Sequence, residues 1–158
     1  IPIYCNTSTK KRIKLSYPWL FKSSKLYPQI MFFKKTNNVF LINKKKSHLK
    51  IKAFDVTHGK AKTRGYLFEK IAYVSDSNHI PLKSLKYLKN LNYLIIDCFR
   101  EEKHVTHFCL EDALKLIKLV KPKKSILTNL HVDLDYKYLK KKLPSNIIPA
   151  YDGLSFNF

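Results

Sequence analysis

Three apolar, strand-like runs in this chain each lead directly into a side chain that can bind a metal ion. They are residues 51–57 before His58, residues 71–75 before Asp76, and residues 125–130 before His131. In an open α/β sheet, ligands collect where the strands reach their carboxyl ends. The three runs therefore predict an α/β fold with one site at one edge of its sheet.

The second half of the chain alternates strand and helix patterns, which favours layered α/β architecture. The clearest helix is predicted over residues 110–120, where one apolar stripe recurs at helical spacing: Leu110, Ala113, Leu114, Ile117 and Val120. Acidic side chains in its first turn and lysines in its last turn match the helix dipole.

Shorter patterns predict the remaining elements. Strands are expected over residues 1–5, 30–33, 39–42, 49–57, 65–68, 71–75, 93–97 and 125–130, with two more within residues 147–158. Helices are expected from Thr7 or Ser8 to about Leu15, from Pro81 to about Asn90, and over residues 136–143. We expect a turn between residues 30–33 and 39–42, and a hairpin that turns at Glu69-Lys70.

The chain has 158 residues, 45% of them hydrophobic, so we expect residues 1–158 to form a single domain with a real core. No apolar run approaches the roughly 18–20 residues that span a bilayer. The three cysteines, Cys5, Cys98 and Cys109, are odd in number and widely spaced. This pattern fits a reducing cytoplasm better than a disulfide framework, and the lack of a C-x-x-C pair argues against a thiolate zinc site.

The formal net charge of +20 raises the possibility of a nucleic-acid partner. Nearly all of the excess is lysine, whereas arginine, whose planar fork suits base and phosphate recognition, occurs only at Arg12, Arg64 and Arg100. We therefore favour solvated lysine faces over a dedicated nucleic-acid surface. A phosphate-bearing substrate is compatible with the same positive field.

Several other side chains are candidates for chemistry. His107 lies just before the helix at residue 110, where imidazole can act on an oxyanion while the helix N-terminus helps to bind phosphate. Asp133 and Asp135 follow His131 and are expected to orient it from outside the metal site. Each residue also has a plainer interpretation: His58 as a structural histidine, Asp76 as a turn residue and His107 as a helix cap. We expect surface positions for His48, His79 and His104.

The order of these residues, and the segments around them, resemble a known family. The segments are Phe54-Asp55-Val56-Thr57-His58-Gly59, Gly65-Tyr66-Leu67-Phe68, Ala72-Tyr73-Val74-Ser75-Asp76, Ile96-Asp97, Thr106-His107-Phe108, Leu127-Thr128-Asn129-Leu130-His131 and Ala150-Tyr151-Asp152-Gly153. Together they resemble the metallo-β-lactamase fold, and within it the branch of the phosphoribosyl 1,2-cyclic phosphate phosphodiesterases. That branch is related to the long-form tRNA-processing endonucleases.

The resemblance implies an αββα sandwich with two divalent metal ions, zinc or manganese, in one cleft. It implies that His58 binds one ion and that Asp76 bridges both. It also implies that His107 stabilises the phosphate oxyanion or protonates the leaving oxygen. The ions would lower the pKa of a bridging water, and the substrate would be a small phosphodiester.

Two differences from the family shape the expected function. The family motif H-x-H-x-D-H does not occur in these 158 residues, and Asn129 stands where many relatives carry the histidine of Leu-Thr-His. His131 lies two residues later, so on an extended strand it would face the same side and substitute as a ligand. We therefore expect the C-terminal portion of a metal-dependent phosphodiester hydrolase, inactive by itself, which holds few or no metal ions without a separate N-terminal half. The alternative is a non-catalytic, basic nucleic-acid-binding or interaction protein on the same scaffold.

Overall fold

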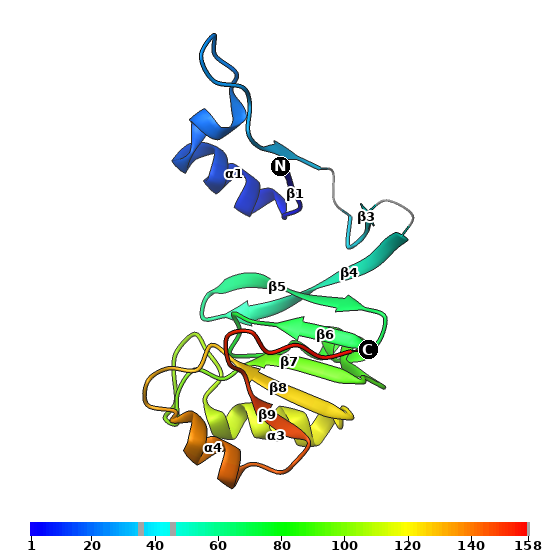
Figure 1. Ribbon diagram of the computed structural model, residues 1–158, viewed down its shortest axis with the longest axis vertical. Helices are drawn as coiled ribbons and strands as arrows, with labels where there is room; N and C mark the ends of the chain where they lie inside the picture. Colours follow the sequence, from blue (N-terminus) through cyan, green and yellow to red (C-terminus); the bar gives the residue numbers. More distant parts are fainter. Residues whose placement is uncertain (35–36, 45–46, 158) are drawn as a thin grey trace. The chain divides into compact units, whose positions relative to one another are not determined.

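The computed structural model describes residues 1–34, 37–44 and 47–157, drawn in Figure 1. The chain divides into two compact units, Ile1–Phe40 and Leu41–Phe158. The expectation that residues 1–158 form a single domain stays a prediction.

The first unit is small. Strand β1 (Pro2–Ile3) pairs in parallel with β2 (Phe32–Phe33), and helix α1 (Thr7–Ser16) and the 3₁₀ helix η1 (Pro18–Phe21) lie between them in the sequence. Thr7 or Ser8 was expected to cap α1, but the cap is Asn6, whose Oδ1 accepts a hydrogen bond from the Thr9 amide at 2.8 Å. The strand expected at residues 30–33 pairs with the start of the chain rather than with residues 39–42.

The second unit is built on a sheet with strand order β3-β4-β5-β6-β7-β8-β9. Its strands are β3 (Val39–Lys44), β4 (Ser47–His58), β5 (Ala61–Phe68), β6 (Ile71–Val74), β7 (Tyr93–Asp97), β8 (Lys124–Thr128) and β9 (Ile147–Pro149). β5 runs antiparallel to both β4 and β6, and β6 to β9 are mutually parallel. As a result β4, β6, β7 and β8 all reach their carboxyl ends at the same edge of the sheet.

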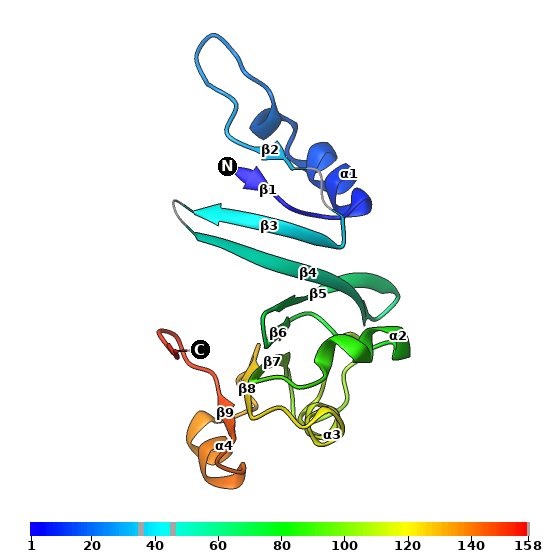
Figure 2. The ribbon, with the colours of Figure 1, turned by 90° about the vertical axis from the view of Figure 1, so that its right-hand side faces the viewer.

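The helices of this unit are α2 (Leu82–Leu85), continued by the 3₁₀ helix η2 (Lys86–Leu88), then α3 (Leu110–Val120) and α4 (Tyr136–Lys142). The predicted helix over residues 110–120 is confirmed at both ends, and its buried side chains are Leu110, Ala113, Leu116 and Ile117. Figure 2 shows α2 and α3 on one face of the sheet. The core lies between them and the sheet, and includes Val56, Val74, Leu94, Ile96 and Leu127 from the strands.

Several expected boundaries were wrong. The helix that was expected to reach about Asn90 ends at Leu88, and Asn90 has a φ of 54° that does not continue a right-handed helix. The strand expected over residues 125–130 ends at Thr128 because Asn129 adopts a left-handed backbone with φ of 62°. Of the two strands expected near the C-terminus, only β9 forms within the described residues up to Asn157. The predicted hairpin at Glu69-Lys70 is confirmed, since Phe68 pairs with Ile71 across it.

Within the described part of the chain, every helix is too short or too polar to cross a bilayer.

Candidate functional site

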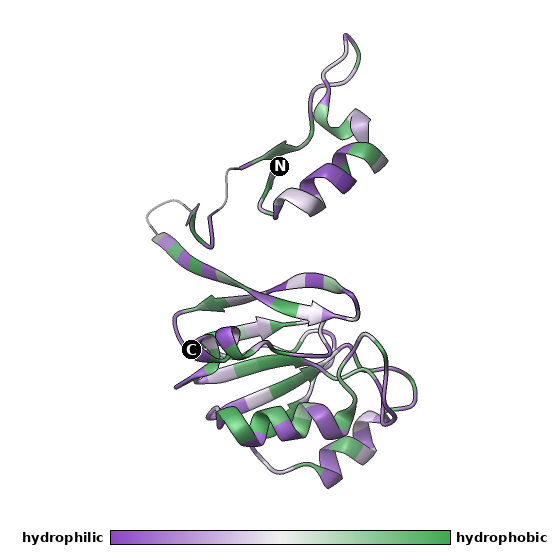
Figure 3. Cartoon of the chain, turned by 180° about the vertical axis from the view of Figure 1, so that it is seen from behind, coloured by the Kyte–Doolittle hydropathy of each residue, from purple (hydrophilic) through white to green (hydrophobic). Residues whose placement is uncertain are grey.

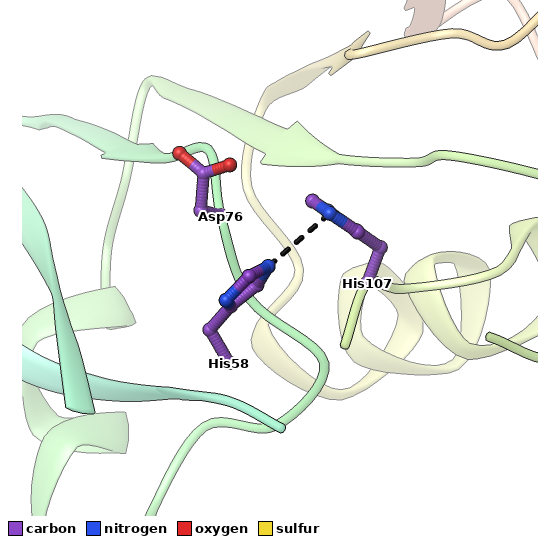
Figure 4. Close-up of side chains that lie close together, drawn as sticks. All are labelled: His58, Asp76 and His107. Carbon is purple, nitrogen blue, oxygen red and sulfur yellow. Dashed lines mark hydrogen bonds between the residues drawn. The ribbon is translucent and has the colours of Figure 1, made fainter. Parts of the chain in front are cut away.

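Three side chains meet at the shared carboxyl edge of the sheet. His58 is the last residue of β4, Asp76 follows the end of β6, and His107 lies in the loop between β7 and α3. One donor atom from each lies within 4.8 Å of those of the other two, as Figure 4 shows. The sheet topology causes this meeting, because β4 and β6, which flank β5, run in the same direction and end at the edge where the loop after β7 begins.

The two histidines face each other through their Nε2 atoms, which are 3.2 Å apart. His107 Nδ1 lies 2.7 Å from Oδ2 of Asp97. A carboxylate only accepts hydrogen bonds, so the proton of neutral His107 is on Nδ1, and its Nε2 lone pair points toward His58. Two nitrogens bound tetrahedrally to one zinc ion are separated by about 3.3 Å, given Zn–N bonds of about 2.0–2.1 Å. The donor set of two imidazoles and a carboxylate therefore fits a divalent metal ion.

Asp97 holds the site in place through hydrogen bonds from its buried carboxylate. Its side chain is fully buried and accepts hydrogen bonds from His107 and from the Ser77 amide at 3.0 Å on one oxygen, and from Asn129 Nδ2 at 3.1 Å on the other. Burial raises the pKa of this carboxyl, and the hydrogen bonds from Ser77, His107 and Asn129 lower it in part. Asp97 was not among the side chains predicted from the sequence to act at the site. The sequence does contain a signal for Asp97, because Asp97 lies at the end of an apolar strand, just as His58 and Asp76 do.

Asp76 is more exposed than the two histidines. Ser75 Oγ donates to its Oδ2 at 3.0 Å, and Thr63 Oγ donates to its main-chain oxygen at 2.7 Å. Both contacts hold the end of β6 in place. Among the described residues, Oδ1 of Asp76 accepts no hydrogen bond, so it is available to a cation.

Asn78 ties two loops of the site together. Its Oδ1 accepts a hydrogen bond from the Gly59 amide at 3.1 Å, and its Nδ2 donates to the Val105 carbonyl at 2.9 Å. Gly59 has a φ of 61°, and a Cβ there would lie 2.8 Å from Cγ2 of Thr106. Glycine at this position therefore lets the turn after His58 approach the loop that carries His107.

His131 does not join this group. Because Asn129 turns the chain, His131 is not on an extended strand, and the same-side argument for its substitution as a ligand fails. Its Nε2 lies 3.3 Å from Nη2 of Arg100, and its Nδ1 lies 3.1 Å from Oδ2 of Asp133. Arginine always donates, so His131 Nε2 accepts from Arg100, while its Nδ1 lies against Asp133, whose amide donates to it at 3.4 Å.

The remaining candidates have other contacts. Asp133 contacts His131, as expected, whereas Asp135 caps α4, with its Oδ1 accepting from the Tyr138 amide at 2.7 Å. Asn129 donates to the Ser75 carbonyl and to Asp97, each at 3.1 Å, and so braces the site rather than replacing an imidazole. His48 and His79 are exposed, as expected. His104 is half-buried against Thr106 and the Phe99 ring, so its predicted surface position was wrong.

Comparison with known proteins identifies the family of this chain. Residues 1–129 match the family model described as "Beta-lactamase superfamily domain". No curated protein sequence matches the chain.

Three solved structures are similar to this chain. A diphosphatase from the PhnP family is 27% identical with a TM-score of 0.84, over 98% of this chain and 56% of its own. The metallo-β-lactamase fold protein YhfI from Bacillus subtilis is 14% identical with a TM-score of 0.71, over 97% and 63%. The short form of human tRNase Z is 14% identical with a TM-score of 0.65, over 98% and 65%.

This chain therefore spans less than two thirds of the length of each of these structures. The predicted metallo-β-lactamase fold is confirmed.

Proposed function

Because the chain belongs to the beta-lactamase superfamily, we propose that it serves as a metal-dependent hydrolase acting on phosphodiesters. One observation carries the proposal: donor atoms of His58, Asp76 and His107 converge within 4.8 Å, and His107 is oriented by a buried carboxylate. A histidine held in this way by a carboxylate is characteristic of metal sites and of acid–base catalysts. The similarity to a diphosphatase supports a phosphorus-containing substrate.

In this proposal His58 and Asp76 hold a zinc or manganese ion. When bound, the ion supplies an activated water and polarises a phosphate oxygen. Nitrogen and carboxylate oxygen donors suit either metal. These two donors, with water or substrate in the remaining positions, can hold no more than one ion, so we propose one ion per chain. His131 lies outside this ligand set, because both of its ring nitrogens face Arg100 and Asp133.

His107 has a different part in the reaction. Its Nε2 points into the space between His58 and Asp76, where a phosphate oxygen of the substrate would lie. In its protonated form the imidazole donates from Nε2 to the leaving oxygen, and Asp97 stabilises the positive charge on the ring. Asp97 is thus a positioning residue that acts through His107.

We also propose that hydrolysis by the 158-residue chain alone is slow. The family mechanism uses two ions, and the three donors that meet in the described residues cannot hold two. Further ligands would come from a polypeptide segment that carries the H-x-H-x-D-H motif. In this view the small phosphodiester lies between the two sets of ligands.

The metal content of the purified chain tests the proposal. After loading with zinc or manganese and dialysis, elemental analysis should find about one ion per chain. His58→Ala and Asp76→Ala should each lose most of it. The exposed His48→Ala is the matched control and should keep it. Full metal retention by both ligand variants would refute the site.

A second measurement separates the role of His107 from that of a ligand. His107→Gln should keep most of the metal but weaken the binding of inorganic phosphate to the metal-loaded protein. If His107→Gln instead loses metal as completely as His58→Ala, His107 is a third ligand and its assignment to proton transfer is wrong.

A further inference from the structure

The first unit of the chain has an unusual charge. Residues 1–40 contain eight Lys and Arg residues and no Asp or Glu, and the first acidic residue of the whole chain is Asp55. About a quarter of the residues thus supply +8 of the formal +20. A segment of one sign with no internal counter-charge is the electrostatic footprint of a polyanion-binding surface.

Four of these charges lie on the outside of the unit, on helix α1. Helix α1 carries Lys10, Lys11, Arg12 and Lys14 and has no buried residue. Lys10 and Lys14 lie one turn apart, with their Nζ atoms 5.3 and 5.9 Å from the centre of the Phe33 ring. Their aliphatic stems cover an aromatic surface, and their ammonium groups stay in water.

A second group of charges lies on the loop after η1. The loop is closed by hydrogen bonds from the amides of Ile30 and Met31 to the Leu20 carbonyl at 3.2 and 2.9 Å. It carries Lys22 and Lys25, both exposed. Its turn is held by Ser24, whose Oγ accepts from the Tyr27 amide at 3.0 Å.

Exposed aromatic rings lie among these charges. Tyr17, Trp19 and Tyr27 are 51%, 62% and 72% exposed. Trp19 makes an edge contact with Tyr17 at 5.7 Å, and η1 is anchored by Phe21, which stacks on Phe33 at 4.6 Å. Large rings left in water beside lysines present π-faces on which nucleic-acid bases can stack.

We propose that the unit Ile1–Phe40 binds single-stranded nucleic acid. The lysines of α1 and of the loop contact backbone phosphates, and Trp19 and Tyr27 stack on bases. Charge and stacking together describe how sequence-tolerant single-strand binding proteins work. The proposal goes beyond the hydrolase function and uses no residue of the metal site.

A membrane surface is the competing partner for a basic unit with exposed aromatics. A helix that lies in a bilayer interface needs a broad apolar face. The only apolar side chains of α1 are Ile13 and Leu15, and Figure 3 shows most of this helix as hydrophilic. The observations therefore favour nucleic acid over a membrane surface as the partner of this unit. Binding to lipid vesicles is one of the outcomes that the test can detect.

Trp19 is the only tryptophan of the chain, so its fluorescence reports on this unit alone. The intact chain is titrated with a single-stranded oligouridine of about 12 nucleotides at several salt concentrations. We expect quenching, and a slope of log K against log salt of about −3, as for about four phosphate contacts. Tyr27→Ala should weaken binding by at least about 5-fold. An oligothymidine of the same length shows whether RNA or DNA is preferred.

Charge variants give the matched comparison. Lys22→Gln/Lys25→Gln should weaken binding and make the salt slope less steep by about 1.4, as for the loss of about two phosphate contacts. Lys140→Gln/Lys141→Gln removes the same charge from exposed positions on α4 and should change the affinity less than 2-fold. Circular dichroism checks that all variants are folded.

Three results would overturn the proposal. The first is equal weakening of binding by both charge variants, which would mean that the oligonucleotide is attracted only by the net positive charge of the whole chain. The second is an unchanged affinity in Tyr27→Ala together with equal binding of a duplex, which would exclude stacking. The third is Trp19 quenching by vesicles of phosphatidylcholine and phosphatidylserine that the oligonucleotide does not compete away.

Discussion

His107 donates its Nδ1–H to the fully buried carboxylate of Asp97 across 2.7 Å, and this contact directs its Nε2 to within 3.2 Å of His58 Nε2. A residue at the end of one strand thereby determines the orientation of a ring in the following loop.

Asp97→Asn should impair the site without enlarging a cavity. An amide nitrogen facing His107 Nδ1 cannot accept its proton, so the ring loses its fixed tautomer and orientation. We expect binding of inorganic phosphate to the metal-loaded protein to weaken about 10- to 100-fold, whereas most of the affinity for zinc or manganese is kept. Isothermal titration measures both affinities. An unchanged phosphate affinity in a folded variant would show that Asp97 does not position His107.

Asn129→His tests whether the site can regain a ligand. Asn129 borders the site through Ser75 and Asp97, and histidine is among the residues that tolerate its left-handed backbone. A further imidazole beside the cluster should bind metal at least about 10-fold more tightly, or hold a second ion. Elemental analysis and titration check this. Weaker binding would mean that the bracing role of Asn129 matters more than an added donor.

Gly59→Ala should disturb both stability and metal binding. The added Cβ would lie 2.8 Å from Thr106 Cγ2, and the φ of 61° disfavours any side chain. The backbone strain alone costs about 1–2 kcal/mol. The double variant Gly59→Ala/Thr106→Ser removes the contacting methyl group. It should recover only the part of the lost stability that is due to the clash, and not the part due to backbone strain. Thermal unfolding and metal titration of the unchanged chain and of the two variants separate the two parts.

Gly65→Ala should destabilise the sheet where β4 pairs with β5. Gly65 pairs with Phe54 across β4 and β5, and a Cβ there would lie 2.5 Å from the Phe54 ring. Phe54 is buried and stacks on Tyr87 at 5.1 Å, so it has little room to move. We expect a loss of about 1–3 kcal/mol in the free energy of unfolding. Denaturant unfolding measures it, and a Gly65→Ala/Phe54→Leu variant that shows no coupling would contradict the stated cause.

The three thiols should differ in reactivity. Burial, reinforced by the nearby charge of Asp97, raises the pKa of Cys98 to about 12, and Cys98 and Cys109 are both almost fully buried. The thiolate is the reactive form, so both should stay unreactive in the folded protein. A thiol-specific chromogenic reagent at pH 8 should label Cys5 first, and all three thiols only after denaturation. Cys5→Ser should abolish the early phase; its persistence would show that one of the buried thiols is accessible.

Local patterns in the sequence were enough for much of the fold. The apolar stripe of residues 110–120 and the hairpin at Glu69-Lys70 were predicted correctly because each depends on neighbouring residues. The boundaries that were wrong depend on single backbone conformations, such as the left-handed Asn129 that ends β8. A propensity argument does not reveal such a conformation, because tertiary contacts to Ser75 and Asp97 stabilise it.

The sequence by itself predicted candidate metal ligands after strand ends, His58 and Asp76 among them, and a catalytic candidate, His107, just before a helix. Only the tertiary structure decided which of these candidates meet. His131 was expected at the site and lies against Arg100 and Asp133, whereas Asp97 had no assigned role and lies beneath His107. The physical reason is that the order and direction of the strands in the sheet decide which strand ends lie together at one edge. These long-range pairings place side chains far apart in the sequence within a few ångströms of one another.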